Sequence, residues 1–320
     1  MSESSAVATM RRAVITGTGS ALPRRRMSNA ELAEQVDTTD EWIVERTGIR
    51  ERHVGGTTVG LSVESGRMAL AAAGLEPGQI DALVLSTTTP DRLVPASSAA
   101  VQRELGLSCG AFDVNAACSG FVYALVQAHG MIAMGAKKVL CIGTDTLARI
   151  TDWSDRNTAV LFADGSGAVV LEAVEGPGQL LGWDLDADGS AERFLGCDHG
   201  GFIHMDGKEV FRRAVRIMVD SATKSMRHAG VTADDVALVV PHQANVRIIQ
   251  AACERLGVPM ERAATVLHRT GNTSSASIPL ALADALDNGR VANGDLVLLV
   301  GFGAGMTAAS AIIRWNGGRK

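Results

Sequence analysis

Aromatic residues and segments dominated by one charge are both scarce in this sequence. Phe, Trp and Tyr together make up 4% of the 320 residues, with a single Tyr. The 30 Lys and Arg residues and the 35 Asp and Glu residues are spread along the chain and give a net charge of −5. Proteins that bind nucleic acids or anionic membranes usually carry a basic patch. Because the sequence has no basic run, we expect neither a nucleic acid nor a membrane surface as a partner.

Long hydrophobic runs and paired cysteines are also missing. No apolar run reaches the roughly 18 residues that indicate a membrane-spanning helix. The first stretch, MSESSAVATMRRAVITG, has no apolar segment followed by a cleavage site. The five cysteines are odd in number and form no CxxC pair; they are Cys109, Cys118, Cys141, Cys197 and Cys253. The sequence therefore predicts a cytoplasmic protein with reduced thiols rather than a disulfide framework.

Apolar segments alternate in a way that predicts strands and helices in turn. In the first half, the pattern indicates strands at 80–89, 111–117 and 137–145, a helix from about Cys118 to Gly135, and two strands around a Gly-rich turn at 156–173. In the second half, it indicates a strand within 235–245, a helix at 246–257, strand, loop and helix over 264–289, and two strands around a turn at 294–315. This alternation predicts an α/β fold with largely parallel sheets covered by helices on both faces.

The repeated order of elements predicts two similar halves. We place their junction near 175–190, where EGPGQLLGWDLDADGS is rich in turn residues. The chain is accordingly divided into a flexible N-terminal extension (1–11), an N-terminal half (12–178) and a C-terminal half (179–320). No long linker or low-complexity tract separates the halves, so we expect them to pack as one body.

Three chemically capable residues occupy similar places in this pattern. Cys118, His242 and Asn272 each lie where a strand is expected to end and a helix to begin. Ligands of open parallel α/β sheets bind beyond the carboxyl ends of the strands. A thiol at a helix N-terminus also meets unpaired N–H groups that favour the thiolate. Alone, each residue has an ordinary structural explanation: a buried Cys, a satisfied His, a capping Asn. Together they favour a catalytic site.

Four stretches resemble the signature motifs of the β-ketoacyl-[acyl-carrier-protein] synthase III family. They are DVNAACSGFVYAL (113–125), VPHQAN (240–245), GNTSSASIP (271–279) and GFGAGMT (301–307). A fifth, DTTDEWIVERTGIRERH (37–53), is similar to the coenzyme A binding segment of that family. The resemblance implies a thiolase-like, five-layered α/β/α/β/α fold of two duplicated halves, in a homodimer. It also implies decarboxylative condensation of an acyl-CoA starter with malonyl-[acyl carrier protein].

The resemblance assigns a role to each reactive residue. Cys118 is the nucleophile that takes the acyl group as a thioester. His242 and Asn272 hydrogen-bond the thioester carbonyl of the malonyl group, where an enolate develops. The backbone N–H groups of Cys118 and Ala304 form the oxyanion hole. No permanently bound cofactor and no metal are implied, since acyl-CoA enters as a substrate.

The resemblance also predicts the surroundings of these residues. Expected at coenzyme A are Trp42, Arg46, Arg156 and Asn245. Expected to dock the carrier protein are Arg247, Arg212 and Arg213. Expected at the acyl pocket are Val94, Phe302 and Met306, with Val94 on a loop that crosses to the partner subunit.

Several alternatives are weighed against this reading. A thiolase would carry a second Cys in the GFGAGMT stretch, which contains none. Chain-elongating synthases carry a His at the position that is Asn272 here, so both classes are disfavoured. A type III polyketide synthase has a longer chain and a proline in its end motif. A non-catalytic CoA- or carrier-binding partner, or another acyltransferase on the same fold, remains open. GTGS (17–20) and GFGAG (301–305) lack the context of a dinucleotide fold.

One further cluster of residues lies in the stretch 196–207. It contains the possible metal ligands Cys197, His199, His204 and Asp206. Their spacing matches no familiar zinc motif. A Gly-rich loop near the acyl pocket is the favoured interpretation of this stretch.

Overall fold

The computed structural model describes residues 12–316 and contains two mixed sheets. The first has the strand order β1-β7-β6-β4-β5, with bounds Arg12–Ala21, Asp164–Val174, Lys138–Thr146, Ala82–Ser86 and Gly110–Val114. In it, β4 runs parallel to β5 and β6, whereas β7 is antiparallel to β1 and β6. The predicted N-terminal extension, residues 1–11, lies outside the described residues.

The second sheet has the order β11-β12-β13-β8, with bounds Val236–Pro241, Leu296–Gly303, Thr307–Arg314 and Leu180–Asp186. Only β11 and β12 are parallel, and β13 is antiparallel to both its neighbours. Between the sheets, β7 ends at Val174 and β8 begins at Leu180. The division into halves at 178/179 falls in this connection, and the duplication of the halves stays a prediction.

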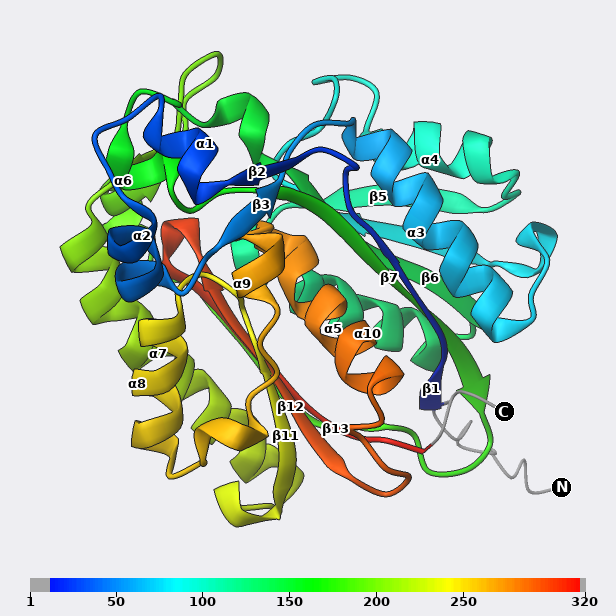
Figure 1. Ribbon diagram of the computed structural model, residues 1–320. Helices are drawn as coiled ribbons and strands as arrows, with labels where there is room; N and C mark the ends of the chain where they lie inside the picture. The colour runs from blue at the N-terminus through cyan, green and yellow to red at the C-terminus, as the bar shows by residue number, and fades with distance from the viewer. Residues whose placement is uncertain (1–11, 317–320) are drawn as a thin grey trace, which may run out of the picture.

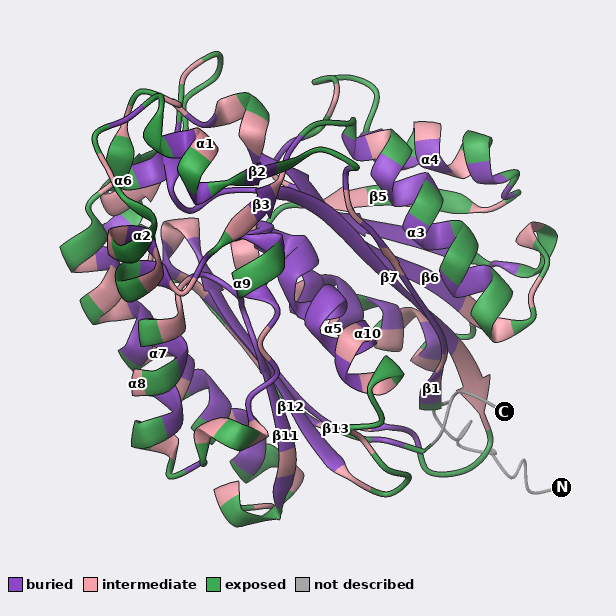
Figure 2. Cartoon of the chain, viewed as in Figure 1, coloured by how far each residue is buried: buried purple, intermediate pink, exposed green. Residues whose placement is uncertain are grey.

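Helices form three layers around the two sheets, which confirms the five-layered α/β fold (Figure 1). The outer face of the first sheet carries α3 and α4, at Thr58–Ala73 and Ser97–Leu105. The outer face of the second carries α7 and α8, at Gly207–Ala229 and Val246–Leu256. Between the sheets lie α5 and α10, at Gly120–Ala133 and Ser277–Asp287. Figure 2 shows this middle layer as mostly buried, since both helices are apolar on nearly every side.

Short elements cover the end of the molecule where the site lies. They are β2 (Arg26–Ser28), α1 (Asn29–Ala33), α2 (Asp40–Thr47), β3 (Glu51–His53), α6 (Arg156–Ala159), β9 (Leu195–Gly196), β10 (His204–Met205) and α9 (Leu267–Thr270). Arg52 of β3 is fully buried there and donates to the side chain of Asn29 at 2.6 Å. No helix within residues 12–316 is both long and apolar enough to cross a bilayer.

Two predicted segments differ in the structure. Residues 156–173 form one helical turn, α6, and the single strand β7, because the carboxylate of Asp155 accepts from the backbone of Asn157 and begins a helix there. The strand expected near 264–268 is absent. Its backbone groups at Val266 and Leu267 instead donate to the buried side chain of Gln243, at 2.8 and 3.3 Å. Apolar residues in both segments are buried in loops around the site. The amino-acid composition of these loops is therefore similar to that of buried strands, which is why strands were predicted.

Candidate active site

The chain turns sharply between β5 and α5, and Cys118 lies in this turn. Ala117 has a positive φ of 48°, which is costly for a residue with a Cβ. The hydroxyl of Ser119 donates to Ala116 O at 2.7 Å and to Thr307 Oγ1 at 2.8 Å. These bonds tie the turn to the first residue of β13 and hold the strained backbone in place.

The end of β12 approaches the Cys118 turn very closely. A Cβ placed on Gly303 would lie 2.6 Å from the backbone N of Cys118 and 2.8 Å from the Cβ of Ala117. Glycine at 303 therefore allows the contact that brings Ala304 beside Cys118. Among the described non-glycine residues, a positive φ occurs at Ala117, Ser274 and Met306. Ala304 is not one of them, so its side chain causes no backbone strain at the proposed oxyanion hole.

Cys118 is half-buried, and its thiol is held in the protonated form. Burial raises the pKa of Cys118 to about 12; the contact with Ser274 opposes this rise and the charge of Asp145 adds to it. Burial therefore opposes the thiolate that the position at a helix start was expected to favour. Cys118 lies in a short 3₁₀ turn, Ala117–Ser119, which precedes the first residue of α5.

His242 follows directly after β11 and is only 1% exposed. Its Nδ1 lies 2.7 Å from Oγ of Ser277, and Phe302 packs against the ring edge-to-face at 5.4 Å. Burial lowers the pKa of His242 to about 3, so the imidazole is neutral at physiological pH. A neutral imidazole carries one N–H and can donate one hydrogen bond to a substrate oxygen.

Asn272 is oriented by its own backbone turn. Its Oδ1 accepts from the backbone of Ser274 at 2.9 Å, which leaves the side-chain NH₂ group to face the cavity that Asn272 lines. Its backbone N–H donates to Leu161 O at 2.9 Å, and its carbonyl accepts from Ala163. Asn272 does not follow a strand as expected, because α9 precedes it.

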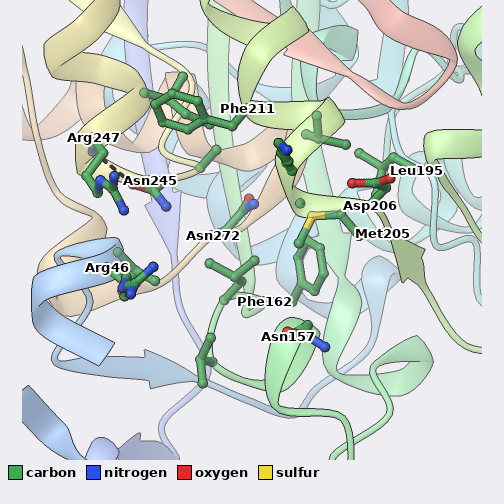
Figure 3. A pocket seen from close by; sticks show the side chains of 18 of the residues that line it. Arg46, Asn157, Phe162, Leu195, Met205, Asp206, Phe211, Asn245, Arg247 and Asn272 are labelled. Carbon is green, nitrogen blue, oxygen red and sulfur yellow. Dashed lines mark hydrogen bonds between the residues drawn. The ribbon is translucent and has the colours of Figure 1, made fainter. Parts of the chain in front are cut away.

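The structure brings Cys118, His242 and Asn272 together on one cavity of about 670 Å³. In Figure 3, Arg46, Asn245 and Arg247 lie on one side of this cavity, and Asn272 lies near its middle. The three predicted catalytic residues are far apart in the sequence. They come together because the two sheets pack around α5 and α10.

A second, smaller cavity of about 280 Å³ also reaches Cys118. Near the thiol it is lined by Ala117, Ser274 and Ala304. Its other walls are mainly apolar and include Leu147, Ile150, Phe162, Leu195 and Ile203. Cys118 therefore lies between a large cavity on one side and a small, mainly apolar cavity on the other.

Three of the four residues expected at coenzyme A line the large cavity, and the fourth, Arg156, packs on one of them. The guanidinium groups of Arg46 and Arg156 lie 5.6 and 4.8 Å from the ring centre of Trp42. Asn245 caps α8 by accepting from the backbone of Arg247 at 2.8 Å. Trp42, Arg46 and Asn245 line the large cavity itself. The start of α8 contacts the end of α2 because Gly48 has no Cβ to collide with Val246.

The three arginines expected to dock the carrier protein differ in the contacts that they make within the protein. Arg247 lines the large cavity and lies 5.8 Å from the ring of Phe211. Arg212 and Arg213 are both paired with Glu209, at 2.6 and 3.4 Å. Their charges are therefore partly offset within α7.

The expected acyl-pocket residues are dispersed. Phe302 lines the large cavity rather than the small one. Met306 lines neither cavity at Cys118, because its side chain is buried in the hydrophobic cluster beneath α7. Val94 is 83% exposed, so its place in a partner's pocket stays a prediction. The stretch 196–207 does lie near the small cavity, which Gly196, Cys197 and Ile203 line. Among residues 12–316, no three His, Cys, Asp or Glu side chains are grouped to hold a metal ion.

Sequence reasoning missed the hydroxyl-rich shell around the three residues. Asp145 is fully buried and accepts from Thr87, Thr88, Thr89 and Ser275 at 2.7–3.2 Å. It thereby joins the end of β4 to the loop that carries Asn272. The run of three Thr residues at 87–89 was the available signal, but such runs are common in ordinary turns.

Comparison with known proteins gives concordant results. The family model described as 3-oxoacyl-[acyl-carrier-protein] synthase III matches residues 112–189, and its C-terminal counterpart matches residues 226–315. The chain is 51% identical to a β-ketoacyl-[acyl-carrier-protein] synthase III of Rhizorhabdus wittichii, over 96% of this chain and 100% of the relative.

Solved structures agree with these matches. The 3-oxoacyl-[acyl-carrier-protein] synthase III from Aquifex aeolicus is 43% identical with a TM-score of 0.93, covering 95% of this chain and 100% of the other. The priming β-ketosynthase of a polyketide biosynthetic pathway is 37% identical with a TM-score of 0.91, covering 96% and 97% of the two chains.

Proposed function

The chain belongs to the 3-oxoacyl-[acyl-carrier-protein] synthase III family, and from this premise we propose how its residues condense an acyl-CoA starter with malonyl-[acyl carrier protein]. The single observation that carries the proposal is the convergence of Cys118, His242 and Asn272 on one cavity. Cys118 offers a nucleophile, whereas His242 and Asn272 are buried and each offers a hydrogen-bond donor.

The first half-reaction transfers the acyl group to the enzyme. Sγ of Cys118 attacks the thioester carbonyl of acyl-CoA, and the tetrahedral intermediate then collapses with cleavage of the bond to the CoA sulfur. The proton that the Cys118 thiol gives up passes to this sulfur, so that coenzyme A leaves as a thiol. The N–H groups of Cys118 and Ala304 face the oxyanion of this intermediate. The acyl chain occupies the small apolar cavity, while the coenzyme A portion lies along the large cavity toward Trp42 and Arg46.

The second half-reaction forms the new carbon–carbon bond. His242 and Asn272 donate hydrogen bonds to the thioester carbonyl of the malonyl group, so that the enolate formed as CO₂ departs is stabilised. The enolate carbon attacks the acyl-Cys118 thioester, and the sulfur of Cys118 leaves as a thiolate, which takes up a proton from water to restore the thiol. The product is a 3-oxoacyl chain on the carrier protein, which starts fatty acid synthesis. The likeness to a polyketide priming synthase keeps the start of a polyketide as the second candidate.

We further infer a homodimer in the cytoplasm. Strand β5 is an edge strand, and the apolar residues Leu93, Val94 and Phe112 near that edge are exposed. An apolar open edge favours pairing with a second copy. The five cysteines are all unpaired, which fits a reducing compartment. Arg247, with help from Arg212 and Arg213, is assigned to the acidic carrier protein.

Intact-protein mass spectrometry tests the two half-reactions separately. Incubation with a panel of acyl-CoAs is expected to add one acyl group, on the peptide that contains Cys118. Asn272→Ala should still be acylated but decarboxylate malonyl-[acyl carrier protein] about 10²–10³-fold more slowly, as for the loss of one oxyanion donor. Acylation of Cys118→Ala at the rate of the parent would overturn the mechanism, and so would normal decarboxylation by Asn272→Ala.

A further inference from the structure

The contact between His242 and Ser277 decides which ring nitrogen of His242 carries the proton. Both side chains are 1% exposed, and Oγ of Ser277 lies 2.7 Å from Nδ1 of His242. This distance alone allows two arrangements: the hydroxyl donates to Nδ1, or Nδ1–H donates to the hydroxyl oxygen. The two arrangements leave the proton on opposite nitrogens of the ring.

A second hydrogen bond to the same oxygen separates these arrangements. The backbone N–H of Gln243 donates to Oγ of Ser277 at 3.3 Å. If Nδ1–H also donated to this oxygen, the hydroxyl hydrogen would need another acceptor. Within the described part of the chain, the hydroxyl of Ser277 forms hydrogen bonds only with Gln243 N and His242 Nδ1. A buried hydroxyl hydrogen without an acceptor is disfavoured, so the hydroxyl donates to Nδ1.

We propose that Ser277 is a positioning residue that fixes His242 in the tautomer with its proton on Nε2. Nε2 lies on the opposite side of the ring from Ser277, and His242 lines the large cavity. The ring then presents an N–H, rather than a lone pair, to the malonyl thioester carbonyl. The NH₂ group of Asn272 faces the same cavity, so the two groups form a matched pair of donors. This inference rests on the proposed function for its catalytic consequence but not for the tautomer itself.

The tautomer is measured directly by ¹⁵N NMR of histidine-labelled protein, with His242 assigned by the signals lost in His242→Gln. In the wild type, Nε2 is expected to show the protonated type of shift and Nδ1 the unprotonated type. Ser277→Ala should mix the tautomers or reverse them, and Ser277→Thr, which keeps the hydroxyl, should restore the wild-type pattern. A proton on Nδ1 in the wild type overturns the inference, even if Ser277→Ala fails to fold.

Kinetics of the separate half-reactions give the second readout. Ser277→Ala is expected to slow malonyl decarboxylation about 10- to 1000-fold, as when an orienting partner of a catalytic histidine is lost. Acylation of Cys118 should change less than about threefold, because it does not use the His242 donor. Ser225→Ala is the matched control: its hydroxyl is equally buried but bonds within α7, at 3.0 Å to Ala222 O. It should leave both half-reactions unchanged.

The outcomes distinguish this inference from the proposed function. A merely structural role for Ser277 would lower the unfolding temperature and slow both half-reactions alike. Unchanged decarboxylation in Ser277→Ala, with an unchanged tautomer, overturns the inference and leaves the function intact. A wild-type protein that never decarboxylates malonyl-[acyl carrier protein] overturns the function, and the NMR result then decides the inference alone.

Discussion

At the scale of single residues, burial holds both Cys118 and His242 in their neutral forms. The pKa of the Cys118 thiol is raised to about 12, and that of the His242 imidazole is lowered to about 3. A neutral His242 is suited to donating a hydrogen bond without drawing a counter-ion into the cavity. A neutral Cys118 is protected from adventitious alkylation and oxidation until acyl-CoA fills the cavity.

The raised pKa of Cys118 predicts how the free enzyme reacts with iodoacetamide. Only the thiolate reacts, and its fraction rises about tenfold per pH unit below the pKa. Alkylation of the Cys118 peptide, followed by mass spectrometry, should therefore keep rising from pH 7 to pH 10. A short cysteine peptide, with an ordinary pKa of about 8.5, should level off near pH 9 and serves as the control. A plateau for Cys118 below pH 9 would show that the thiol is acidic in the free enzyme.

The sequence pointed to the three proposed catalytic residues, which the structure places on one cavity, but not to the side chains that hydrogen-bond around them. Cys118, His242 and Asn272 are recognisable because each is a distinctive residue between apolar elements. Ser277 and Asp145 are as important to the geometry, but Ser and Asp are common near turns and helix starts. Their partners are distant in sequence: Asp145 and Ser275 are 130 residues apart. Only the folded chain shows such pairs.

At the scale of elements, the site is the meeting point of three strained turns. Ala117, Ser274 and Met306 each have a positive φ, and each belongs to a different one of these turns. The apolar strands β4, β5, β6 and β11 and the helices α5 and α8 agree with the predicted segments, because their apolar runs are continuous. The long helix α3 was not predicted. Segments 156–173 and 264–289 were misread, because loop residues such as Val160 and Val266 are as buried as core strands.

Gly303 is predicted to be indispensable to the approach of β12 to the Cys118 turn. The Cβ of Gly303→Ala would meet backbone, not a flexible side chain, 2.6 Å away at Cys118 N. Relief of this clash must move the Cys118 turn or the end of β12, and with it one of the two proposed oxyanion donors. Cys118 acylation is therefore expected to fall at least about 100-fold, as for loss of one donor. Gly130→Ala on the exposed side of α5 is the control, since nothing lies within 4 Å of its Cβ. Near-normal acylation by Gly303→Ala would contradict the proposed oxyanion hole.

At the scale of the whole molecule, the remaining question is what closes the small cavity. The loop that carries Val94 projects from the protomer, with Leu93 and Val94 at 78% and 83% exposure. Exposed apolar residues beside an open sheet edge favour burial against a second subunit. Residues of both subunits of the proposed dimer, rather than of one chain, would then determine which acyl-CoA starter is accepted.

Val94→Phe tests whether this loop limits the length of the starter. A larger side chain in the partner's pocket should penalise hexanoyl-CoA more than isobutyryl-CoA, and acetyl-CoA least, when kcat/KM values are compared. Each methylene that no longer fits forfeits about 0.8 kcal/mol of burial, roughly fourfold in preference. Size-exclusion chromatography checks whether the variant keeps the oligomeric state of the parent, which we propose to be a dimer. If the variant is dimeric and the ratios of its kcat/KM values for the three acyl-CoAs equal those of the parent, Val94 does not line the acyl pocket.

The large cavity that Cys118, His242 and Asn272 share has a consequence for the order of events. In the proposed mechanism, the coenzyme A of the first substrate and the carrier thioester of the second reach the same sulfur through the same space. Both cannot occupy it together, so the first product must depart before the second substrate arrives. We therefore expect ping-pong kinetics, in which free coenzyme A competes with the carrier-bound malonyl group for the acylated enzyme.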